Sequence, residues 1–413
     1  MIYLDANATS RLRPEAVKAL SAALADGAFA NPSSVHRLGR SARALLREAR
    51  REVLALLGST QGEAELVFTS GGTEACNLML LGFLGGAKAI AQGGHIVTSA
   101  IEHPAVLEPL AELERQGWEV SYVLPASDGR VAAAAIAEAC RKDTVLVVLM
   151  AANNETGAVQ PVAEAARLIA AQGMAPIFVS DATQAVGKTH LDVRELFDAG
   201  VLAIAFSGHK LGAPAGIGAL VYSTKADRCY SLAPIIRGGP QEQRLRGGTE
   251  NVVGALAFGA VASAVRQDLD ADLARRRKLR DALWLLMQER IPDAVRLGPA
   301  PEAEAVSESG ATEASVSNTL LVRFPGCRGD DLVAALDLNG VAASTGSACS
   351  SGRQDVSPSV RALGLQGQAA REVIRFSLDW HTSSTEVEAA GAIIARTVGQ
   401  LRSAGAQELT DAA

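Results

Sequence analysis

The sequence predicts an α/β protein: a mostly parallel β-sheet flanked by helices, followed by a smaller α+β domain. Short apolar runs alternate with longer stretches rich in Ala, Leu, Glu and Arg. Strands that are apolar on both faces and separated by helices are typical of a parallel sheet covered on both sides. The length of 413 residues also exceeds the size at which one hydrophobic core stops growing, which favours two domains of unequal size.

The large domain is predicted over residues 15–262. Its predicted strands are the apolar runs at residues 66–68, 96–98, 145–150, 177–179 and 202–206. The small domain is predicted to combine residues 1–14 with residues 263–413, which contain a charged, helix-prone stretch, the segments NTLLVRF and VIRFSL, and an amphipathic helix from Thr385. Residues 299–317 have almost no bulky apolar side chain, so this acidic segment is predicted to be a surface loop.

Composition and charge exclude several classes of protein. Hydrophobic residues make up 48% and charged residues 20% of the chain, as in a globular protein. A formal charge of -6 gives no overall attraction to nucleic acid or membrane lipid, and the basic run at residues 275–280 is expected to be the solvated face of a helix. The sequence starts without a secretion signal and has no apolar stretch of membrane-spanning length, so we expect a cytoplasmic protein.

The five cysteines are an odd number, widely scattered and without a C-x-x-C pair. This pattern argues against a disulfide framework and against a metal site, and it predicts reduced thiols. Cys349 stands apart, because in STGSACSSG every neighbour is Gly, Ala, Ser or Thr. Its thiol has no apolar neighbour to cover it and no second cysteine within reach.

Polar segments follow the predicted strands. They are TSGGTEACN after Phe68, TSAIEHPAV after Val97, AANNETG after Met150, SDATQAVG after Val179 and SGHKLGAPAGIG after Phe206. Because ligands of open parallel sheets bind beyond the carboxyl ends of the strands, we expect these segments to converge on one edge of the sheet and form a ligand site.

One of these segments suits an anionic ligand group, and another suits a cationic one. In TSGGTE, Gly72 and Thr73 stand where a strand turns into a helix, and the N–H groups of a helix start favour phosphate; a glycine turn with a helix cap is the alternative. Asp181 follows a buried strand, with Gln184 three residues on. A buried carboxylate needs a cation or hydrogen bonds, which a protonated heterocyclic nitrogen would provide; an aspartate that caps the next helix is the alternative.

Three further side chains are candidates for chemistry. Partial burial of Lys210 among small residues would lower its pKa and make it a usable nucleophile or proton carrier; a lysine that reaches solvent or pairs with a carboxylate is the alternative. His103 is either functional or a core histidine. Arg375 alternates with apolar residues, so it points into a cleft, where it could bind a carboxylate with two bonds, or it forms a structural salt bridge.

A phosphate site, an aspartate, a lysine, a histidine and an arginine are together the groups that pyridoxal phosphate (PLP) chemistry requires. The lysine forms a Schiff base with this cofactor, the aspartate keeps the ring nitrogen protonated, and the arginine orients an amino acid. A thiol on a loop of small side chains, such as Cys349, could then move to a substrate atom and away again.

The chain closely resembles PLP-dependent cysteine desulfurases of the nitrogen-fixation and iron-sulfur-cluster type, within the class V aminotransferases. The matching stretches are YLDANAT, NPSSVH, VFTSGGTEACN, IEHPAV, NNETGAVQP, DATQAVGK, FSGHK, GIGAL, RGGTEN, SNTL, STGSACSSG and IRFSL. The resemblance implies the type I fold of PLP-dependent transferases, with a seven-stranded type of sheet in a large PLP-binding domain, and a homodimer. It places the cysteine loop, about residues 344–356, in the small domain.

The resemblance also implies roles for single residues. Lys210 would bind the cofactor covalently and move the α-proton, His103 would stack on the ring and assist proton transfer, and Asp181 would pair with the ring nitrogen. Gln184 would contact the ring's phenolate oxygen, and Cys349 would attack the substrate sulfur and become a persulfide. Other implied cofactor contacts are Gly72, Thr73, Ser207, His209 and, from the second subunit, Thr249; implied substrate contacts are Asn154, Arg375 and Asn7.

The implied reaction converts L-cysteine to L-alanine and passes the sulfur to an acceptor protein, such as an iron-sulfur scaffold. Alternatives are a selenocysteine lyase, an aminotransferase for a small amino acid, and a non-catalytic scaffold that docks sulfur acceptors. The chain departs from the family pattern at Ala215, where relatives often carry lysine, and at Pro240, where glycine is common. Its acidic segment at residues 299–317 is also longer than usual.

Overall fold

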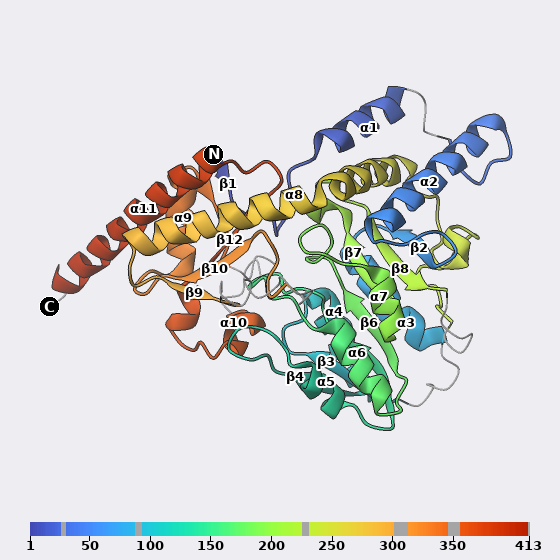
Figure 1. Cartoon of the computed structure of the whole chain (residues 1–413), viewed down its shortest axis with the longest axis horizontal. Helices are drawn as coiled ribbons and strands as arrows, with labels where there is room; N and C mark the ends of the chain where they lie inside the picture. The colour runs from blue at the N-terminus through green and yellow to red at the C-terminus, as the bar shows by residue number, and fades with distance from the viewer. Residues whose placement is uncertain (26–29, 87–92, 225–230, 301–312, 346–355, 412–413) are drawn as a thin grey trace.

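A seven-stranded β-sheet forms the centre of the computed structural model, which describes residues 1–25, 30–86, 93–224, 231–300, 313–345 and 356–411 (Figure 1). In their order across the sheet, the strands are β2 (Ala64–Thr69), β8 (Gly218–Ser223), β7 (Ala203–Ser207), β6 (Ile177–Asp181), β5 (Thr144–Val148), β3 (His95–Ser99) and β4 (Glu119–Val123). All of them run parallel except β8, which pairs antiparallel with β2 and β7. The predicted mostly parallel sheet is confirmed.

Helices cover both faces of this sheet. One face carries α3 (Gly72–Gly86) and α4 (Pro104–Arg115). The other face carries α2 (Arg37–Leu56), α5 (Ala133–Ala139), α6 (Val162–Ala171), α7 (Val193–Ala199) and the first half of α8 (Val252–Arg290), against which α1 (Pro14–Ala25) packs. Because successive strand residues point to opposite faces, Leu66 and Phe68 join the core on the α2 side, whereas Val67 joins the core on the α3 side.

The five predicted strands correspond to β2, β3, β5, β6 and β7. Residues 149–150 were predicted as strand but lie beyond the end of β5. Strands β4 and β8 were not predicted. The missed strand β4 is at the edge of the sheet and half exposed, so its sequence WEVSYV lacks the continuous apolar run of a central strand.

A second, smaller core lies beside the large sheet. It is built around an antiparallel sheet with the strand order β12 (Val373–Ser377), β10 (Thr319–Arg323) and β9 (Val295–Leu297), and a parallel pair of β1 (Ile2–Tyr3) and β11 (Val341–Ala342). The second half of α8, α9 (Gly329–Leu338) and α11 (Ser384–Asp411) pack on these strands, and Leu4 from the start of the chain is buried among them. The amphipathic helix predicted from Thr385 is confirmed. Short elements complete the chain: α10 (Pro358–Ala362), η1 (Gly208–Lys210), η2 (Glu242–Arg244) and η5 (Ala369–Arg371).

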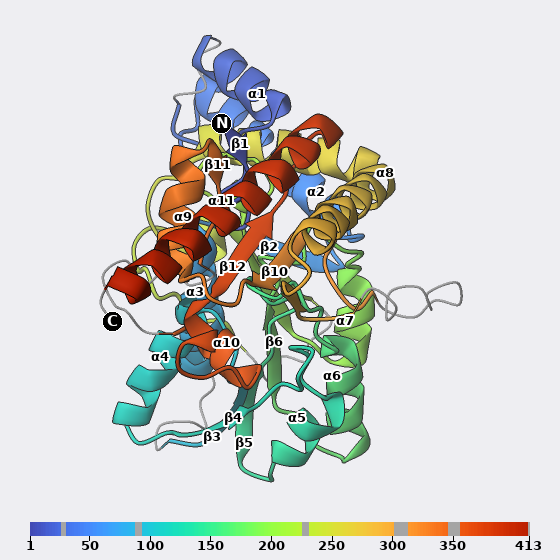
Figure 2. The same ribbon diagram turned by 90° about the vertical axis from the view of Figure 1, so that its left-hand side faces the viewer.

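Helix α8 connects the two cores without a break. Val252 to Val265 pack in the core of the large sheet, and Leu279 to Met287 pack in the small core beside α11 (Figure 2). The predicted domain boundary at residue 262 falls inside this helix, so the division into residues 15–262 and the rest stays a prediction. By length and composition α8 could cross a membrane, but half of its apolar window is buried, as expected for a core helix.

Two features of the surface differ from the sequence-based expectation. In the basic run at residues 275–280, Arg276 and Arg280 are buried, and Arg280 donates to the Val316 carbonyl oxygen over 2.8 Å. The acidic segment predicted as a surface loop ends in the buried residues 314–317. The two differences are linked at Arg280, because its buried guanidinium satisfies polar groups of Ser315 and Val316 that this segment brings inside.

We expect Gly259→Ala to destabilise the protein, although alanine usually stabilises a helix by about 1 kcal/mol over glycine. A Cβ atom at Gly259 in α8 would lie 2.7 Å from the Cα atom of Ala49 in α2, where only backbone movement can make room. Overpacking of this kind costs about 1–3 kcal/mol. Urea unfolding measures the change, and Gly399→Ala in α11, where a Cβ would meet nothing within 4 Å, is the control and should stabilise. Equal effects at the two positions would contradict the close packing of α2 on α8.

Candidate functional site

A cavity of about 370 Å³ lies beyond the carboxyl ends of the parallel strands, between the large sheet and β12. It gathers eleven of the thirteen residues predicted for the site. They are Asn7, Gly72, Thr73, His103, Asn154, Asp181, Gln184, Ser207, His209, Lys210 and Arg375. The convergence of the strand-end segments on one edge of the sheet is therefore confirmed.

Lys210 ends the short helix η1, directly after β7. Its side chain is half-buried and its Nζ donates to two backbone carbonyl oxygens, that of Asn7 over 2.7 Å and that of Ala8 over 2.6 Å. Both acceptors belong to the segment between β1 and α1. The amine is thus held at the cavity by two backbone carbonyl oxygens.

Asp181 is the last residue of β6 and is only 6% exposed. Its Oδ1 accepts a hydrogen bond from the backbone N–H of Thr183 over 2.9 Å. Thr183 also lines the cavity and was not predicted. A buried carboxylate in a cavity wall favours a cationic ligand atom, because burial of an unpaired charge is costly.

The start of α3, with Gly72 and Thr73, forms another part of the cavity wall. Gly72 approaches β7 so closely that a Cβ atom there would lie 3.2 Å from the Cβ atom of Ser207 and 3.3 Å from the Oγ1 atom of Thr183. This close approach requires glycine. The approach brings the first N–H groups of the 15-residue helix α3 to the cavity. Burial, with two lysines nearby, lowers the pKa of His209 to about 4, so at neutral pH this ring is an uncharged hydrogen-bonding group.

These groups fit PLP, the cofactor implied by the family. A helix start with glycine, threonine and serine suits its phosphate, the buried carboxylate of Asp181 suits its protonated ring nitrogen, and the amine of Lys210 suits its aldehyde. Among the described residues no group of three or more His, Cys, Asp or Glu side chains could hold a metal ion.

His103 caps the start of α4. Its Nδ1 accepts a hydrogen bond from the backbone N–H of Ala105 over 3.0 Å, and the ring lines the cavity. Because Nδ1 is an acceptor, the neutral ring carries its proton on Nε2. Any proton that His103 exchanges with a ligand therefore passes through Nε2.

Arg375 in β12 and Asn154 after β5 lie together in the cavity wall. The guanidinium of Arg375 donates to the Asn154 carbonyl oxygen over 3.0 Å and to Asp5 Oδ1 over 2.9 Å. The sequence left two alternatives for Arg375, a structural salt bridge or a position in a cleft. The structure shows both, because Arg375 pairs with Asp5 and also lines the cavity. Its buried Nε has no hydrogen-bond partner in the described part of the chain, and the residue lines the cavity.

Asn7 lines the cavity, but its side-chain amide is bonded inside the protein. Nδ2 donates to the Thr319 hydroxyl over 2.8 Å and to the Asn154 carbonyl oxygen over 3.1 Å, while Oδ1 accepts from Lys188 over 2.9 Å and from Asn318 over 3.1 Å. These contacts assign Asn7 a structural part in the site. A direct contact with substrate stays a prediction.

Two predicted residues are not in the cavity. Thr249 is exposed and does not line it, so the predicted reach of Thr249 into the site of a second subunit stays a prediction. Cys349 lies outside the described residues. The positions that flank its segment are nevertheless fixed at the cavity wall: Ser344 exchanges two backbone hydrogen bonds with Arg375, and Ser357 donates to the Glu155 carboxylate over 2.5 Å.

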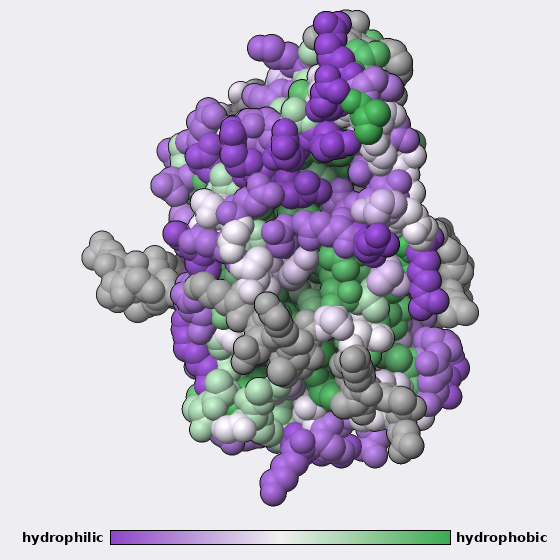
Figure 3. Space-filling model, turned by 90° about the vertical axis from the view of Figure 1, so that its right-hand side faces the viewer, coloured by the Kyte–Doolittle hydropathy of each residue, from purple (hydrophilic) through white to green (hydrophobic). Residues whose placement is uncertain are grey.

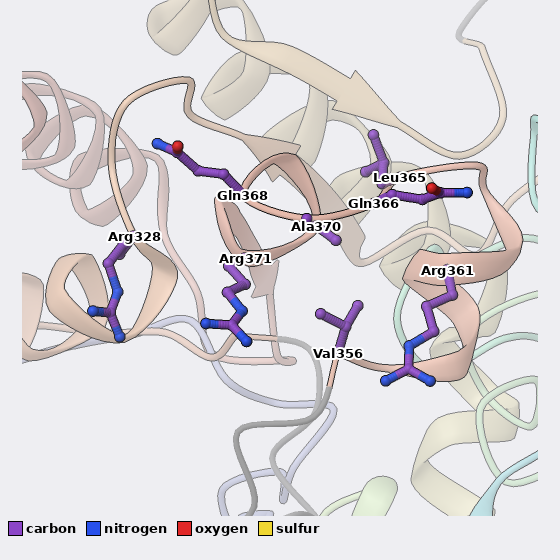
Figure 4. Close-up of a pocket in the computed structure, with 9 residues that line it drawn as sticks. Arg328, Val356, Arg361, Leu365, Gln366, Gln368, Ala370 and Arg371 are labelled. Atoms are coloured by element: carbon purple, nitrogen blue, oxygen red, sulfur yellow. The ribbon is translucent and has the colours of Figure 1, made fainter.

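A second and more open cavity, of about 740 Å³, lies beside the flanking residue Val356. Three arginines line it, Arg328, Arg361 and Arg371 (Figure 4). Their guanidinium groups extend on the same side as Val356, whereas Gln368 points away. All three side chains are exposed, which makes this a basic surface next to the cysteine-bearing segment.

Glu102, next to His103, was not predicted as a site residue. It is fully enclosed, and its Oε1 accepts from the Ser99 hydroxyl over 2.5 Å and from the Met150 backbone N–H over 2.8 Å, while Oε2 has no partner in the described part of the chain. Burial raises the pKa of Glu102 to about 8. At neutral pH this carboxyl is therefore protonated. Glu102 then places no second negative charge near Asp181.

We expect Glu102 to make stability depend on pH. A raised folded-state pKa adds stability that is complete below the unfolded pKa, about 4.3, and that is lost as pH rises through about 8. Across that interval the free energy of unfolding should fall by about 1.4 kcal/mol per pH unit relative to Glu102→Gln, which stays neutral. Urea unfolding of both proteins from pH 5 to pH 9 measures this difference. Parallel curves would mean that Glu102 is ionised in the folded protein.

Comparison with known proteins agrees with the cavity. The family "Aminotransferase class-V" matches residues 2–390. A cysteine desulfurase IscS of Dictyoglomus turgidum is 35% identical over 402 residues, 97% of this chain and 95% of that protein. A cysteine desulfurase of Gluconacetobacter diazotrophicus is 38% identical over 402 residues, 97% of this chain and 94% of that protein.

Solved structures give the same result. A structure described as a NifS-like protein has a TM-score of 0.84 and 30% identity and covers 96% of this chain and 99% of its own. A structure described as SspA in complex with cysteine has a TM-score of 0.74 and 27% identity and covers 93% of this chain and 100% of its own. This chain belongs to the class V aminotransferase family.

Proposed function

We propose that this protein is a PLP-dependent cysteine desulfurase, which converts L-cysteine to L-alanine and carries the sulfur as a persulfide on Cys349. One observation supports it most: a single cavity combines the Lys210 amine, the buried Asp181 carboxylate and a glycine-opened helix start, and the segment that bears Cys349 is anchored at its wall. The cysteine desulfurases among the relatives support the same substrate.

When bound, PLP supplies an electron-withdrawing ring that makes the α-proton of an amino acid removable. Asp181 keeps the ring nitrogen charged, and the amine of Lys210 moves the α-proton. His103 exchanges a proton at Nε2. The guanidinium of Arg375, together with Asn154, receives the substrate carboxylate, which orients the Cα–H bond and the side-chain sulfur in the cavity.

Cys349 completes the reaction as the nucleophile. Its thiolate attacks the substrate sulfur, a S–S bond forms, the substrate C–S bond breaks, and its electron pair takes up a proton to leave alanine. Cys349 is five residues after Ser344, whose backbone bonds hold it to Arg375. Five residues span at most about 18 Å, which is enough to reach into a cavity whose wall contains Arg375.

The test is incubation of the PLP-loaded protein with L-cysteine and a reductant, with sulfide and alanine both measured. We expect equal yields, a loss of both products of at least a hundredfold in Cys349→Ala, and a colourless protein in Lys210→Ala. Cys140→Ala is the control, because burial raises the pKa of this thiol to about 11 and keeps it unreactive. Full turnover in Cys349→Ala would favour an aminotransferase, and pyruvate with ammonia would indicate a lyase.

We further propose that the basic cavity lined by Arg328, Arg361 and Arg371 receives an acidic face of the sulfur-acceptor protein. It lies beside Val356, the first described residue after the Cys349 segment, so an acceptor docked there would contact the chain where this segment ends. Its exposed guanidiniums favour carboxylates. An iron-sulfur scaffold is the acceptor that the family suggests.

Charge reversal tests this surface. We expect the double variant Arg361→Glu, Arg371→Glu to lower the rate of sulfur transfer to an acceptor protein by about tenfold, because like charges at the encounter surface repel. Sulfide release to a small reductant should stay unchanged, since the cavity of the cofactor is untouched. Arg115→Glu, an exposed arginine at the end of α4, is the control. Equal loss with acceptor and with small reductant would contradict a docking role.

The predicted homodimer is also a proposal. Thr249 is exposed and lies outside the cavity of its own chain. Apolar residues, drawn green in Figure 3, are exposed around the middle of one face below a hydrophilic end, and exposed apolar patches mark interaction sites. The apolar patch supports a second subunit at this face. The cytoplasmic location stays a prediction.

A further inference from the structure

Lys188 is a buried lysine to which the proposed reaction gives no part. It is 2% exposed and lies four residues after Gln184, in a turn where its backbone N–H donates to the Ala185 carbonyl oxygen over 2.9 Å. Its Nζ donates to Oδ1 of Asn7 over 2.9 Å and to Oε1 of Gln184. Within the described residues it forms no ion pair, and both of these partners are amide oxygens.

Lys188 can donate to both amide oxygens in either protonation state. Burial lowers the pKa of Lys188 well below its usual range, and the nearby cations Lys210, Arg276 and Arg375 lower it further. An ammonium has three N–H donors and a neutral amine has two, and the two amide oxygens accept two of them. Lys188 is therefore a hydrogen-bond donor to both amides.

Two contacts of the Gln184 amide, one of them with Lys188, fix which way this amide faces. The other partner of this amide is the backbone carbonyl oxygen of Asn7, which can only accept, over 3.2 Å from Nε2. Nε2 must therefore face Asn7, and Oε1 must face Lys188. Since Nε2 carries a second N–H and Gln184 lines the cavity, the amide offers the ligand a donor.

We propose that Lys188 is a positioning residue of the cofactor site, which holds the Gln184 and Asn7 amides so that Gln184 presents an N–H group, and not its carbonyl oxygen, to the ring oxygen of the cofactor. Without Lys188 the Gln184 amide keeps only the Asn7 carbonyl oxygen as a partner, so its N–H group is held less firmly toward the ring oxygen. The inference rests on the proposed function, because the cofactor is its ligand.

Asn7 connects Lys188 to the amine that binds the cofactor. The backbone carbonyl oxygen of Asn7 accepts from Lys210 Nζ over 2.7 Å as well as from Gln184. The side chain of the same residue is held by Lys188. Loss of Lys188 therefore loosens two of the groups that meet the cofactor, the amide of Gln184 and the acceptor of Lys210.

The test variant is Lys188→Met, which keeps the length and burial of the side chain but removes its N–H donors. The measurements are the dissociation constant of PLP and the pH midpoint of the absorbance change of the bound cofactor. We expect about tenfold weaker binding and a midpoint raised by about one pH unit, the effect of one hydrogen bond to a charged oxygen. Lys142→Met, at an exposed lysine, should change neither value.

A double-mutant cycle separates positioning from simple loss of stability. In a Gln184→Ala background, Lys188→Met should shift the midpoint much less than in the original protein, because its effect passes through Gln184. Additive shifts, or a Lys188→Met protein with an unchanged midpoint, would overturn the inference. If Lys188→Met does not fold, Lys188→Gln, which keeps N–H donors on a shorter chain, is compared in the same two backgrounds, and additivity is again the overturning result.

The two proposals fail in different ways. An original protein that stays colourless with PLP would refute the proposed function, since there would be no cofactor for Lys188 to act on. An original protein that turns yellow and releases sulfide, with no change of midpoint in Lys188→Met, would refute only the role of Lys188.

Discussion

The buried amide of Asn7 is the contact on which the site depends. It joins Thr319 and Asn318, which belong to the small core, to Lys188 of the large sheet, and its backbone oxygen holds Lys210. Each unsatisfied polar group in such a place costs about 1–3 kcal/mol, so the segment that carries Asn7 has one stable position. That position closes the cavity on the side opposite to α3.

The cavity is therefore shared between two packed units. The strand ends of the large sheet provide the groups for the cofactor, and they are rigid because the strands are buried on both faces. The small core provides Arg375 and both flanking positions of the cysteine segment. Helix α8 runs through both units, which fixes the distance between the strand-end residues and Arg375.

The strand-end residues could be predicted because parallel strands bring their carboxyl ends to the same edge, whatever the details of packing. Asp181 and Lys210 each directly follow a clear apolar run, and that rule alone places them together. Lys188 was missed although its spacing of four from Gln184 is a helical signal, because sequence cannot tell that a lysine is buried. Glu102 was missed for the same reason.

Long-range contacts account for the other differences. The predicted contact of Asn7 with substrate stays a prediction, but its amide is also held by residues more than 140 positions away, which no local pattern reveals. The buried Arg280 is a similar case, since its partner Val316 belongs to a segment that looks like a surface loop. The position of Cys349 lies outside the described residues, so the sequence remains the basis for its role.

The pairing of the first strand with one of the last has a consequence for synthesis. Strand β1 pairs with β11, and the backbone of Ala6 and Asn7 is bonded to Ser377. During translation β1 cannot pair until β11 and Ser377 have been synthesised. At about 5–20 residues per second, synthesis of the chain up to these residues takes roughly 20–70 s. The nascent chain therefore forms its large sheet first, and vitamin B6 loading is an event of the finished polypeptide.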